Sequence, residues 1–258
     1  MTRDVKVHLL PALFEPDEVR GGIAVILDIL RASTTITHAL AHGAKAVIPA
    51  GEVDEARRIA VDYPKGSVLL GGEREGVLIE GFDLDNNPFA YTPEAVAGKT
   101  IVFTTSNGTK ALLRAGKADR VLIGSFVNLQ AVVNVLVADL RPIHLVCAGT
   151  QGKITLEDSL CAGGICHRLQ LWSDTHGEGD DFNCDDDQTQ LALNHYWFRA
   201  SAPEDNDSAP ILEAISTSRG GRNCNRLGFE DQIARAATYD LFDIVPEYEQ
   251  ESRTIKAR

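Results

Sequence analysis

The sequence has 258 residues, 44% of them hydrophobic, so it can bury a substantial core and fits one large α/β domain or two small ones. Its formal net charge of −12 argues against nucleic acid as a partner, because phosphate backbones attract clustered Lys and Arg. No apolar stretch approaches the roughly 20 residues that cross a bilayer, and residues 1–10 lack the long apolar segment of a signal peptide, so we expect a cytoplasmic protein without membrane contact.

Short apolar runs alternate with helical patterns over the first two thirds of the chain. The predicted strands are Val5–Leu10, Ile23–Asp28, Ala46–Pro49, Val68–Gly71, Thr100–Thr105, Arg120–Gly124 and Ile143–Cys147. Helices are expected between them at 33–43, 93–98 and 129–140. This alternation predicts an α/β fold with a largely parallel or mixed sheet, helices on both faces, and a ligand site at the carboxyl ends of the strands.

The last third of the chain changes character. Acidic residues accumulate in 173–210, which we interpret as a solvated, variable insert with a helix at Gln188–Arg199 and an exposed loop at Ser201–Ala209. A metal-binding loop is the alternative, although the EF-hand spacing is absent. Helices are then expected at 211–218 and 229–238, a last strand at Leu241–Val245, and a frayed polar tail. We therefore divide the chain into a main region 1–172, the insert 173–210, and a completing region 211–258.

The five cysteines form no CxxC pair. Cys147, Cys161 and Cys166 have apolar or small neighbours, which is typical of reduced core thiols. A catalytic thiol at Cys147 is the alternative, because this residue ends a predicted strand.

Charged residues follow two of the apolar runs. Asp28 ends the second run and Arg31 comes three residues later, so in a helical turn both side chains can address one ligand. A capping carboxylate or a mutual salt bridge would explain them without a ligand. Glu73 and Arg74 stand in the sequence GGEREG, where the glycines favour a loop in which both side chains converge.

The segment TTSNGTK follows a third apolar run. Asn-Gly is a strong hairpin signal, but the helical pattern ALLRAG comes next. A Ser/Thr-rich loop that enters a helix exposes N–H groups and hydroxyls that suit phosphate, although the Walker order is absent. The predicted substrate-binding residues are Ser33, Thr105, Ser106, Asn107, Gly108 and Thr109.

The segment Thr155–Asp158 opens another predicted helix. Thr155 with an acid three residues later resembles a capping box, which needs no ligand, but Glu157 is an acid that the cap does not use. Together Asp28, Glu73, Glu157 and Asp158 are a carboxylate set typical of Mg²⁺ binding, while Arg31 and Arg74 suit an oxyanion. This combination predicts metal-assisted phosphoryl chemistry on a small anionic phosphorylated substrate.

The motifs VILDILRASTT, GEREGVLIEGFDLDNNP, TTSNGT, CAGT and LEDSLCAG resemble, in this order, the 2-phosphosulfolactate phosphatase family. The resemblance implies a Mg²⁺-dependent phosphatase that converts 2-phospho-3-sulfolactate to sulfolactate and phosphate, a step of coenzyme M biosynthesis. Two positions depart from the family pattern, which has glycine at Asp85 and serine at Asn87. A lost hydroxyl and a gained acid could alter the substrate preference.

We hypothesise that Asp28, Glu73 and either Glu157 or Asp158 hold Mg²⁺, with Arg31, Arg74 and the 106–109 loop on the substrate's oxyanions. Attack by water and attack by Asp28 itself are both open. A phosphatase for another small phosphorylated hydroxy acid and a non-catalytic anion-binding module are the rival interpretations. The sequence also leaves a homo-oligomer open.

Overall fold

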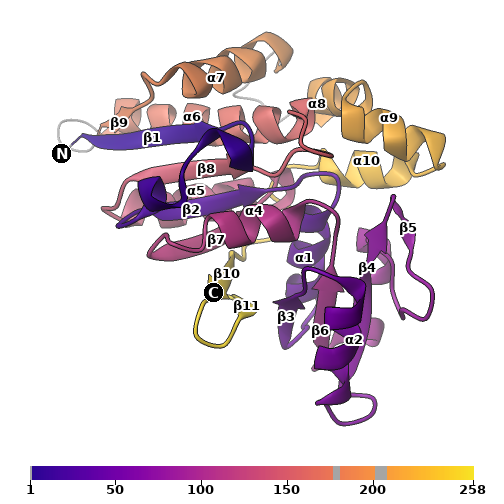
Figure 1. The fold of residues 1–258 in the computed structure, drawn as a ribbon. Coiled ribbons are helices and arrows are strands. Elements are labelled where there is room, and N and C mark those ends of the chain that lie inside the picture. Colours follow the sequence, from indigo (N-terminus) through magenta and orange to yellow (C-terminus); the bar gives the residue numbers. More distant parts are fainter. Residues whose placement is uncertain (1, 177–180, 201–207) are drawn as a thin grey trace.

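A mixed sheet runs through the whole molecule. The computed structural model describes residues 2–176, 181–200 and 208–258 (Figure 1). Within these ranges one sheet has the strand order β5-β4-β6-β3-β11-β10-β7-β2-β8-β1-β9. The strands are β1 (Arg3–His8), β2 (Ile23–Leu27), β3 (Ala46–Pro49), β4 (Val68–Arg74), β5 (Val77–Leu78), β6 (Thr100–Thr104), β7 (Arg120–Gly124), β8 (Ile143–Cys147), β9 (Phe182–Asn183), β10 (Pro246–Glu249) and β11 (Thr254–Ala257).

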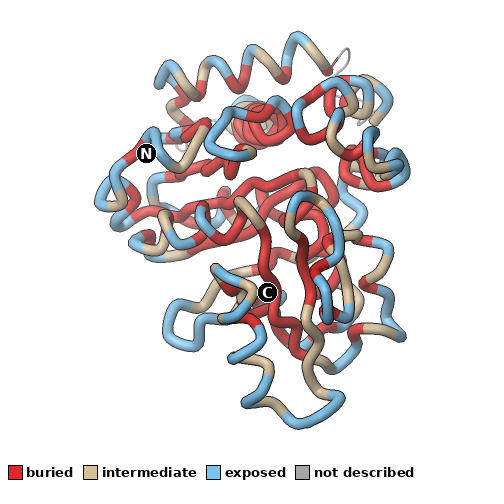
Figure 2. The backbone as a smooth tube through the Cα atoms, turned by 45° about the vertical axis from the view of Figure 1, so that its right-hand side comes forward, coloured by how far each residue is buried: buried red, intermediate tan, exposed pale blue. Residues whose placement is uncertain are grey.

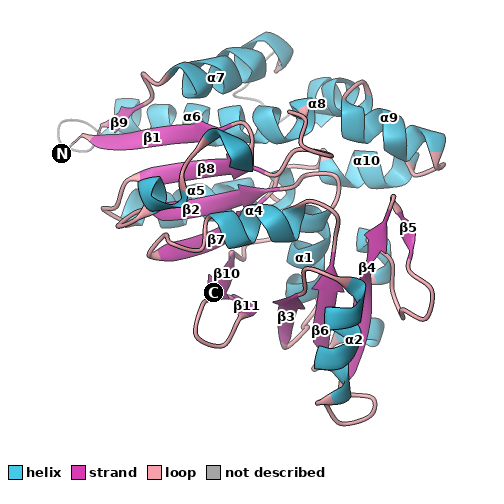
Figure 3. Cartoon of the chain, viewed as in Figure 1, coloured by secondary structure: helices cyan, strands magenta, loops and turns pink. Residues whose placement is uncertain are grey.

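The sheet consists of two parallel parts that a C-terminal hairpin joins. Strands β7, β2, β8 and β1 are parallel to one another, and so are β4, β6 and β3. The hairpin β10–β11 is antiparallel to both parts, with β10 beside β7 and β11 beside β3. Figure 3 shows that the two parallel parts run at a steep angle to each other. Residues that follow β2, β4, β6 and β8 nevertheless line one cavity.

Helices cover both faces of the sheet, as the α/β pattern predicted. They are α1 (Ala32–Ala41), α2 (Val53–Val61), α3 (Pro93–Val96), α4 (Gly108–Arg114), α5 (Leu129–Ala138), α6 (Leu156–His176), α7 (Asp187–Arg199), α8 (Ser208–Ser216), α9 (Arg219–Arg226) and α10 (Glu230–Ala236). Strand β2 contributes to two cores, because successive side chains of a strand point to opposite faces. Val25 and Leu27 pack with residues of α5 and α6, whereas Ala24 and Ile26 pack with residues of α1 and α4. Figure 2 shows these buried strands at the centre of the molecule.

The prediction of a last strand at Leu241–Val245 and a frayed tail is wrong. The strands instead lie at Pro246–Glu249 and Thr254–Ala257. Backbone pairing with distant residues stabilises them, since Tyr248 lies opposite Val121 and Ile255 opposite Val47. Such pairing leaves little local signal in a polar segment.

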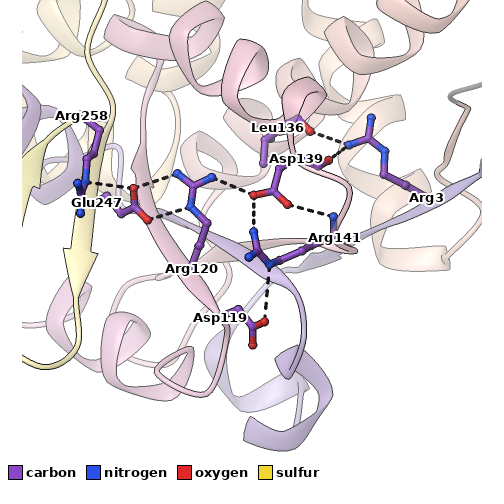
Figure 4. Close-up of polar contacts among 8 residues, drawn as sticks. All are labelled: Arg3, Asp119, Arg120, Leu136, Asp139, Arg141, Glu247 and Arg258. Atoms are coloured by element: carbon purple, nitrogen blue, oxygen red, sulfur yellow. Dashed lines mark hydrogen bonds and ion pairs between the residues drawn. The ribbon is translucent and has the colours of Figure 1, made fainter.

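Ion pairs also attach this hairpin to the sheet (Figure 4). Arg120 on β7 donates from Nε to Glu247 Oε1 and from Nη2 to Glu247 Oε2, both at 2.9 Å, and from Nη1 to Asp139 Oδ2 at 2.9 Å. Arg141 donates to the same Asp139 oxygen at 2.7 Å. Bidentate pairing of this kind fixes orientation more strongly than a single contact does.

The 173–210 segment is more ordered than a solvated loop. Strand β9 pairs with β1, and α7 begins at Asp187, where Thr189 Oγ1 accepts a hydrogen bond from Val7 N at 2.9 Å. Of the predicted Ser201–Ala209 loop, residues 201–207 lie outside the described residues. The loop prediction is wrong for Ser208 and Ala209, which belong to α8. Among the described residues, no helix is both long and apolar enough to cross a membrane.

The cysteines are buried, unpaired thiols, as expected. Cys147 is 1% exposed, and burial together with nearby Asp158 raises the pKa of its thiol well above the usual value. A thiol held in its protonated form is a poor nucleophile, so the structure argues against Cys147 as a catalytic residue.

Candidate active site

A cavity of about 540 Å³ opens where the ends of the two parallel parts meet. Its lining combines acidic, basic and hydroxyl-bearing side chains from segments that are far apart in the sequence. The lining residues are Asp28, Leu30, Arg31, Glu73, Glu75, Gly76, Asn86, Thr105, Ser106, Asn107, Thr150, Gln151, Arg219, Gly220, Arg222, Asn223, Cys224 and Arg226.

Asp28 follows β2 directly and is 7% exposed. Its backbone N–H donates to Ser33 Oγ at 2.9 Å, and its Oδ1 accepts a long 3.4 Å bond from Ala32 N. Among the described residues no donor reaches Oδ2. Burial, with a further contribution from neighbouring acids, chiefly Asp158, raises the pKa of Asp28 well above its usual value. The carboxylate is therefore only partly used as a helix cap.

Arg31 lies in the same cavity but does not pair with Asp28, so the salt-bridge interpretation is wrong for the described residues. Its guanidinium donates to Gln232 Oε1 at 2.6 Å and to Gly76 O at 2.6 Å, and it lies 4.8 Å from the centre of the Phe229 ring. The residue is 5% exposed. These partners are all uncharged, so Arg31 is a buried cation without an acidic counter-ion among the described residues.

Glu73 and Arg74 do not converge, because β4 continues through both residues and pairs with β5. The predicted loop is therefore wrong, and alternation along the strand turns the two side chains in different directions. Glu73 accepts from Ser106 N at 3.0 Å and from Gly76 N at 2.7 Å. Arg74 is absent from the cavity lining and donates to Thr104 Oγ1 at 2.9 Å.

The Thr/Ser-rich segment enters α4 at Gly108, so the hairpin alternative is wrong. Thr105, Ser106 and Asn107 line the cavity. Thr109 does not, and its Oγ1 contacts Ala50 O at 3.4 Å.

Gly108 supports the site without lining the cavity, because a Cβ built there would lie 2.8 Å from Asp28 Oδ2. Ser33 also has a supporting position. Besides accepting from Asp28 N, its hydroxyl donates to Ile26 O at 3.2 Å.

Two acids at the start of α6 have different environments. Asp158 accepts from Ile29 N and Gly149 N, both at 2.9 Å, and from Thr155 Oγ1 at 2.8 Å, so it holds two loops together. Glu157 accepts from Gly220 N at 3.1 Å through Oε1, while its buried Oε2 has no hydrogen-bond partner in the described part of the chain. Burial raises the pKa of both carboxyls. The unpaired Glu157 oxygen is the feature that a structural cap does not explain.

Of the four predicted metal ligands, only those with a carboxylate oxygen free of protein donors are available to a metal ion. Within the described residues, no group of three or more His, Cys, Asp or Glu side chains could hold a metal ion. Protein donors occupy both oxygens of Glu73 and of Asp158, whereas Asp28 and Glu157 each keep one oxygen that no described donor reaches. Asp28 lines the cavity, while Glu157 is 2% exposed and is not part of the lining. Mg²⁺ commonly binds through one or two carboxylates plus water and phosphate oxygens. The donor set therefore fits Mg²⁺ on Asp28 and Glu157.

Helix α9 is the part of the lining that the sequence analysis missed. Arg219, Arg222, Asn223 and Arg226 all face the cavity. Their spacing of three and four residues places them on one face of a helix, and this spacing was the available signal.

The two departures from the family motif lie beside the cavity. Asp85 Oδ1 accepts from Asn87 N at 3.0 Å, and Asn87 Oδ1 accepts from Phe89 N at 3.0 Å. The substituted residues thus stabilise their own turn. The intervening Asn86 lines the cavity, and its buried Oδ1 has no hydrogen-bond partner within residues 2–176, 181–200 and 208–258.

Comparisons with known proteins agree with these motifs. The family model described as 2-phosphosulpholactate phosphatase matches residues 8–251. A probable 2-phosphosulfolactate phosphatase of Caldanaerobacter subterraneus is 38% identical over 222 residues, which cover 86% of each chain. One of the same name from Symbiobacterium thermophilum is 37% identical over 240 residues, covering 93% of this chain and 95% of that one. The predicted resemblance is thus confirmed, and the chain belongs to the 2-phosphosulpholactate phosphatase family of phosphoric monoester hydrolases.

Proposed function

We propose that this protein is a Mg²⁺-dependent phosphatase that hydrolyses 2-phospho-3-sulfolactate to 3-sulfolactate and phosphate, a step of the coenzyme M biosynthesis type. Membership of the family and the names of the relatives support the reaction. The observation that carries the proposal is the environment of the buried Arg31 guanidinium. A guanidinium that is 5% exposed and has only neutral partners leaves its charge uncompensated, which is costly unless an anion binds.

Different residues of the site would bind the phosphoryl group and the metal ion. Arg31 and the side chains of Thr105, Ser106 and Asn107 contact the phosphoryl oxygens and stabilise charge that develops on them. Asp28 and Glu157 would hold Mg²⁺, which when bound supplies Lewis-acid polarisation of the phosphoryl group. Glu73 and Asp158 position these groups, because their oxygens accept backbone N–H bonds from the surrounding loops.

Asp28 is the group placed to start the reaction. Its buried carboxylate has a raised pKa, which suits a base that removes a proton from attacking water. Attack by Asp28 Oδ2 itself is the second route. The stereochemical course at phosphorus separates them, because one in-line attack by water inverts the configuration of a chiral phosphoryl group, whereas two successive displacements through an aspartyl phosphate retain it.

The decisive variant is Asp28→Asn. It should hydrolyse no 2-phospho-3-sulfolactate while keeping the thermal unfolding midpoint of the wild type, because the amide keeps the volume but loses the charge. Asp62→Asn, at the exposed residue that follows the end of α2, is the matched control and should keep full activity. Wild-type turnover by the Asp28 variant, or full activity of the wild type in excess EDTA, would refute the proposal.

A second substrate class has its own support. Asp85 and Asn87 flank the cavity residue Asn86, and both differ from the family motif, so the pocket could be adapted to another small phosphorylated hydroxy acid. Values of kcat/KM for 2-phospho-3-sulfolactate and 2-phospholactate distinguish the two candidates. A sulfonate-specific site should lose heavily when that group is missing.

A further inference from the structure

Helix α9 presents a row of arginines to the cavity. Arg219, Arg222 and Arg226 occupy positions i, i+3 and i+7 of an eight-residue helix, and all three line the cavity. The opposite face carries Gly220, Gly221 and Cys224, which are buried. Gly220 and Cys224 also line the cavity, so α9 borders it along much of its length and the arginines are the charged side chains that it contributes there.

These arginines have no carboxylate partner among the described residues. Arg222 donates to Thr217 O and Arg226 donates to Asn223 Oδ1 at 2.8 Å, whereas Arg219 makes no hydrogen bond or ion pair with any residue that the structure describes. Arginines elsewhere do find acids, as Arg120 does with Glu247. Three unpaired guanidiniums on two turns of helix repel one another, so an anion bound between them would relieve the repulsion.

The helix is fixed at two points of the candidate active site. At its N-terminus Gly220 N donates to Glu157 Oε1 at 3.1 Å. Farther along, the β4–β5 turn approaches it so closely that a Cβ on Gly76 would lie 2.7 Å from Leu227 Cδ1 and 3.3 Å from Asn223 Nδ2. The arginines thus share one cavity with Arg31, whose guanidinium donates to Gly76 O.

The three arginines lie at different distances along the axis of α9. With a rise of about 1.5 Å per residue, Arg222 lies about 4.5 Å beyond Arg219, and Arg226 about 10.5 Å beyond it. A three-carbon phosphate ester with two further acid groups therefore spans two neighbouring arginines but not the whole row. Arg219 and Arg222 are the pair at the end of the helix where Gly220 binds Glu157. Among the described residues, none of the three acids in the lining, Asp28, Glu73 and Glu75, forms an ion pair with either arginine, and Glu73 already accepts two backbone N–H groups.

We infer that Arg219 and Arg222 bind the acid groups of the substrate that do not react, its carboxylate and sulfonate, and so select phosphate esters that carry both. This inference rests on the proposed function and adds the residues that determine specificity. Arg31 and the 105–107 segment contact the phosphoryl group, whereas α9 recognises the remainder of the substrate. The fork of a guanidinium matches carboxylate and sulfonate oxygens in a bidentate contact.

The test compares three esters, namely 2-phospho-3-sulfolactate, 2-phospholactate and ethyl phosphate. Arg219→Gln and Arg222→Gln should each lower kcat/KM for the first ester about 10- to 100-fold, mainly through KM, as expected for one lost charge-assisted hydrogen bond. Ethyl phosphate should be hydrolysed at the wild-type rate. Arg58→Gln is the matched control and should change nothing, because Arg58 on α2 is exposed and its guanidinium donates to Asp54 O, with no other partner among the described residues. Arg219→Lys should restore part of the loss.

Equal losses on all three esters, or no loss on any, would overturn the inference. Calorimetric titration with 3-sulfolactate gives a readout that does not depend on turnover. Its Kd should rise at least tenfold in Arg219→Gln, while the Kd of inorganic phosphate stays unchanged. Failure of the wild type to hydrolyse 2-phospho-3-sulfolactate would refute the proposed function, whereas unchanged 3-sulfolactate affinity in the arginine variants would refute only the assignment of α9.

Discussion

Gly108→Ala should lower the catalytic rate while leaving the free energy of unfolding nearly unchanged. Gly108 is the first residue of α4, and a Cβ there would lie 2.8 Å from Asp28 Oδ2 and 3.2 Å from Ala32 Cβ. Non-bonded heavy atoms prefer about 3.5 Å, so the carboxylate must move by as much as about 0.7 Å. The backbone of Gly108 is outside the left-handed region, and alanine favours a helix over glycine by up to about 1 kcal/mol. The free energy of unfolding should therefore change little.

The activity should respond far more strongly. A misplacement of about 1 Å can cost about 100-fold in rate, so we expect a 10- to 100-fold lower kcat on 2-phospho-3-sulfolactate. Urea unfolding checks that stability stays within about 1 kcal/mol of the wild type. Gly51→Ala is the matched control, because a Cβ there meets only Glu55 Oε2 at 3.4 Å. Activity within twofold of the wild type in folded Gly108→Ala would refute the proposed role of Asp28.

Three further predictions concern stability. His8 Nε2 and His144 Nδ1 lie 3.0 Å apart, and burial lowers the pKa of both rings to about 4, so both stay neutral until the pH falls well below the unfolded value of 6.5. Between pH 6.5 and pH 4 the unfolded chain binds protons that the folded chain does not, which lowers the free energy of unfolding by about 2 kcal/mol per ring at pH 5. When the pH is lowered from 7.5 to 5, the free energy of unfolding of the double variant His8→Gln/His144→Gln should thus fall by about 2 to 4 kcal/mol less than that of the wild type, as measured by urea titration. The buried carboxylates contribute equally to both proteins, so an equal fall would contradict the prediction. Gly76→Ala should lower the thermal unfolding midpoint more than Gly66→Ala, because φ is +87° and +85° at the two glycines, while a Cβ would meet a described neighbour within 4 Å at Gly76 and none at Gly66. Equal decreases would show that the contact is unimportant. Arg120→Met should cost about 2 to 3 kcal/mol in urea unfolding, because it leaves two partly buried carboxylates without their shared cation, and a cost below 0.5 kcal/mol would show that the network contributes little.

The sequence predicted the parallel parts of the sheet because burial on both faces leaves a local signal. Ile23–Leu27 is apolar at every position, and all five residues are buried. The C-terminal hairpin left no comparable signal. Tyr248 and Ile255 are its only large apolar side chains, and its strands exist because β7 and β3 offer unpaired edges far away in the sequence.

The same contrast holds in the cavity. Asp28 and the 105–107 segment follow buried strands, so the rule that ligands bind at the carboxyl ends of strands located them. Arg74 was placed there on the assumption that glycines end a strand. In the structure β4 passes through both glycines, where Gly72 has a φ of +130° and lies against the backbone of Thr104. The glycines serve close packing of strands there, and Arg74 consequently lies outside the cavity.

Helix α9 could not be assigned to the cavity by local reasoning, because its position depends on contacts from two other motifs. Glu157 binds its N-terminus through Gly220, and the β4–β5 turn packs against Leu227. Only after these segments have packed do the arginines of α9 enter the same cavity as Arg31. A chain with a net charge of −12 thereby forms a cavity whose lining includes four arginines, Arg31, Arg219, Arg222 and Arg226. Local charge, rather than the charge of the whole chain, decides which ligand such a cavity attracts.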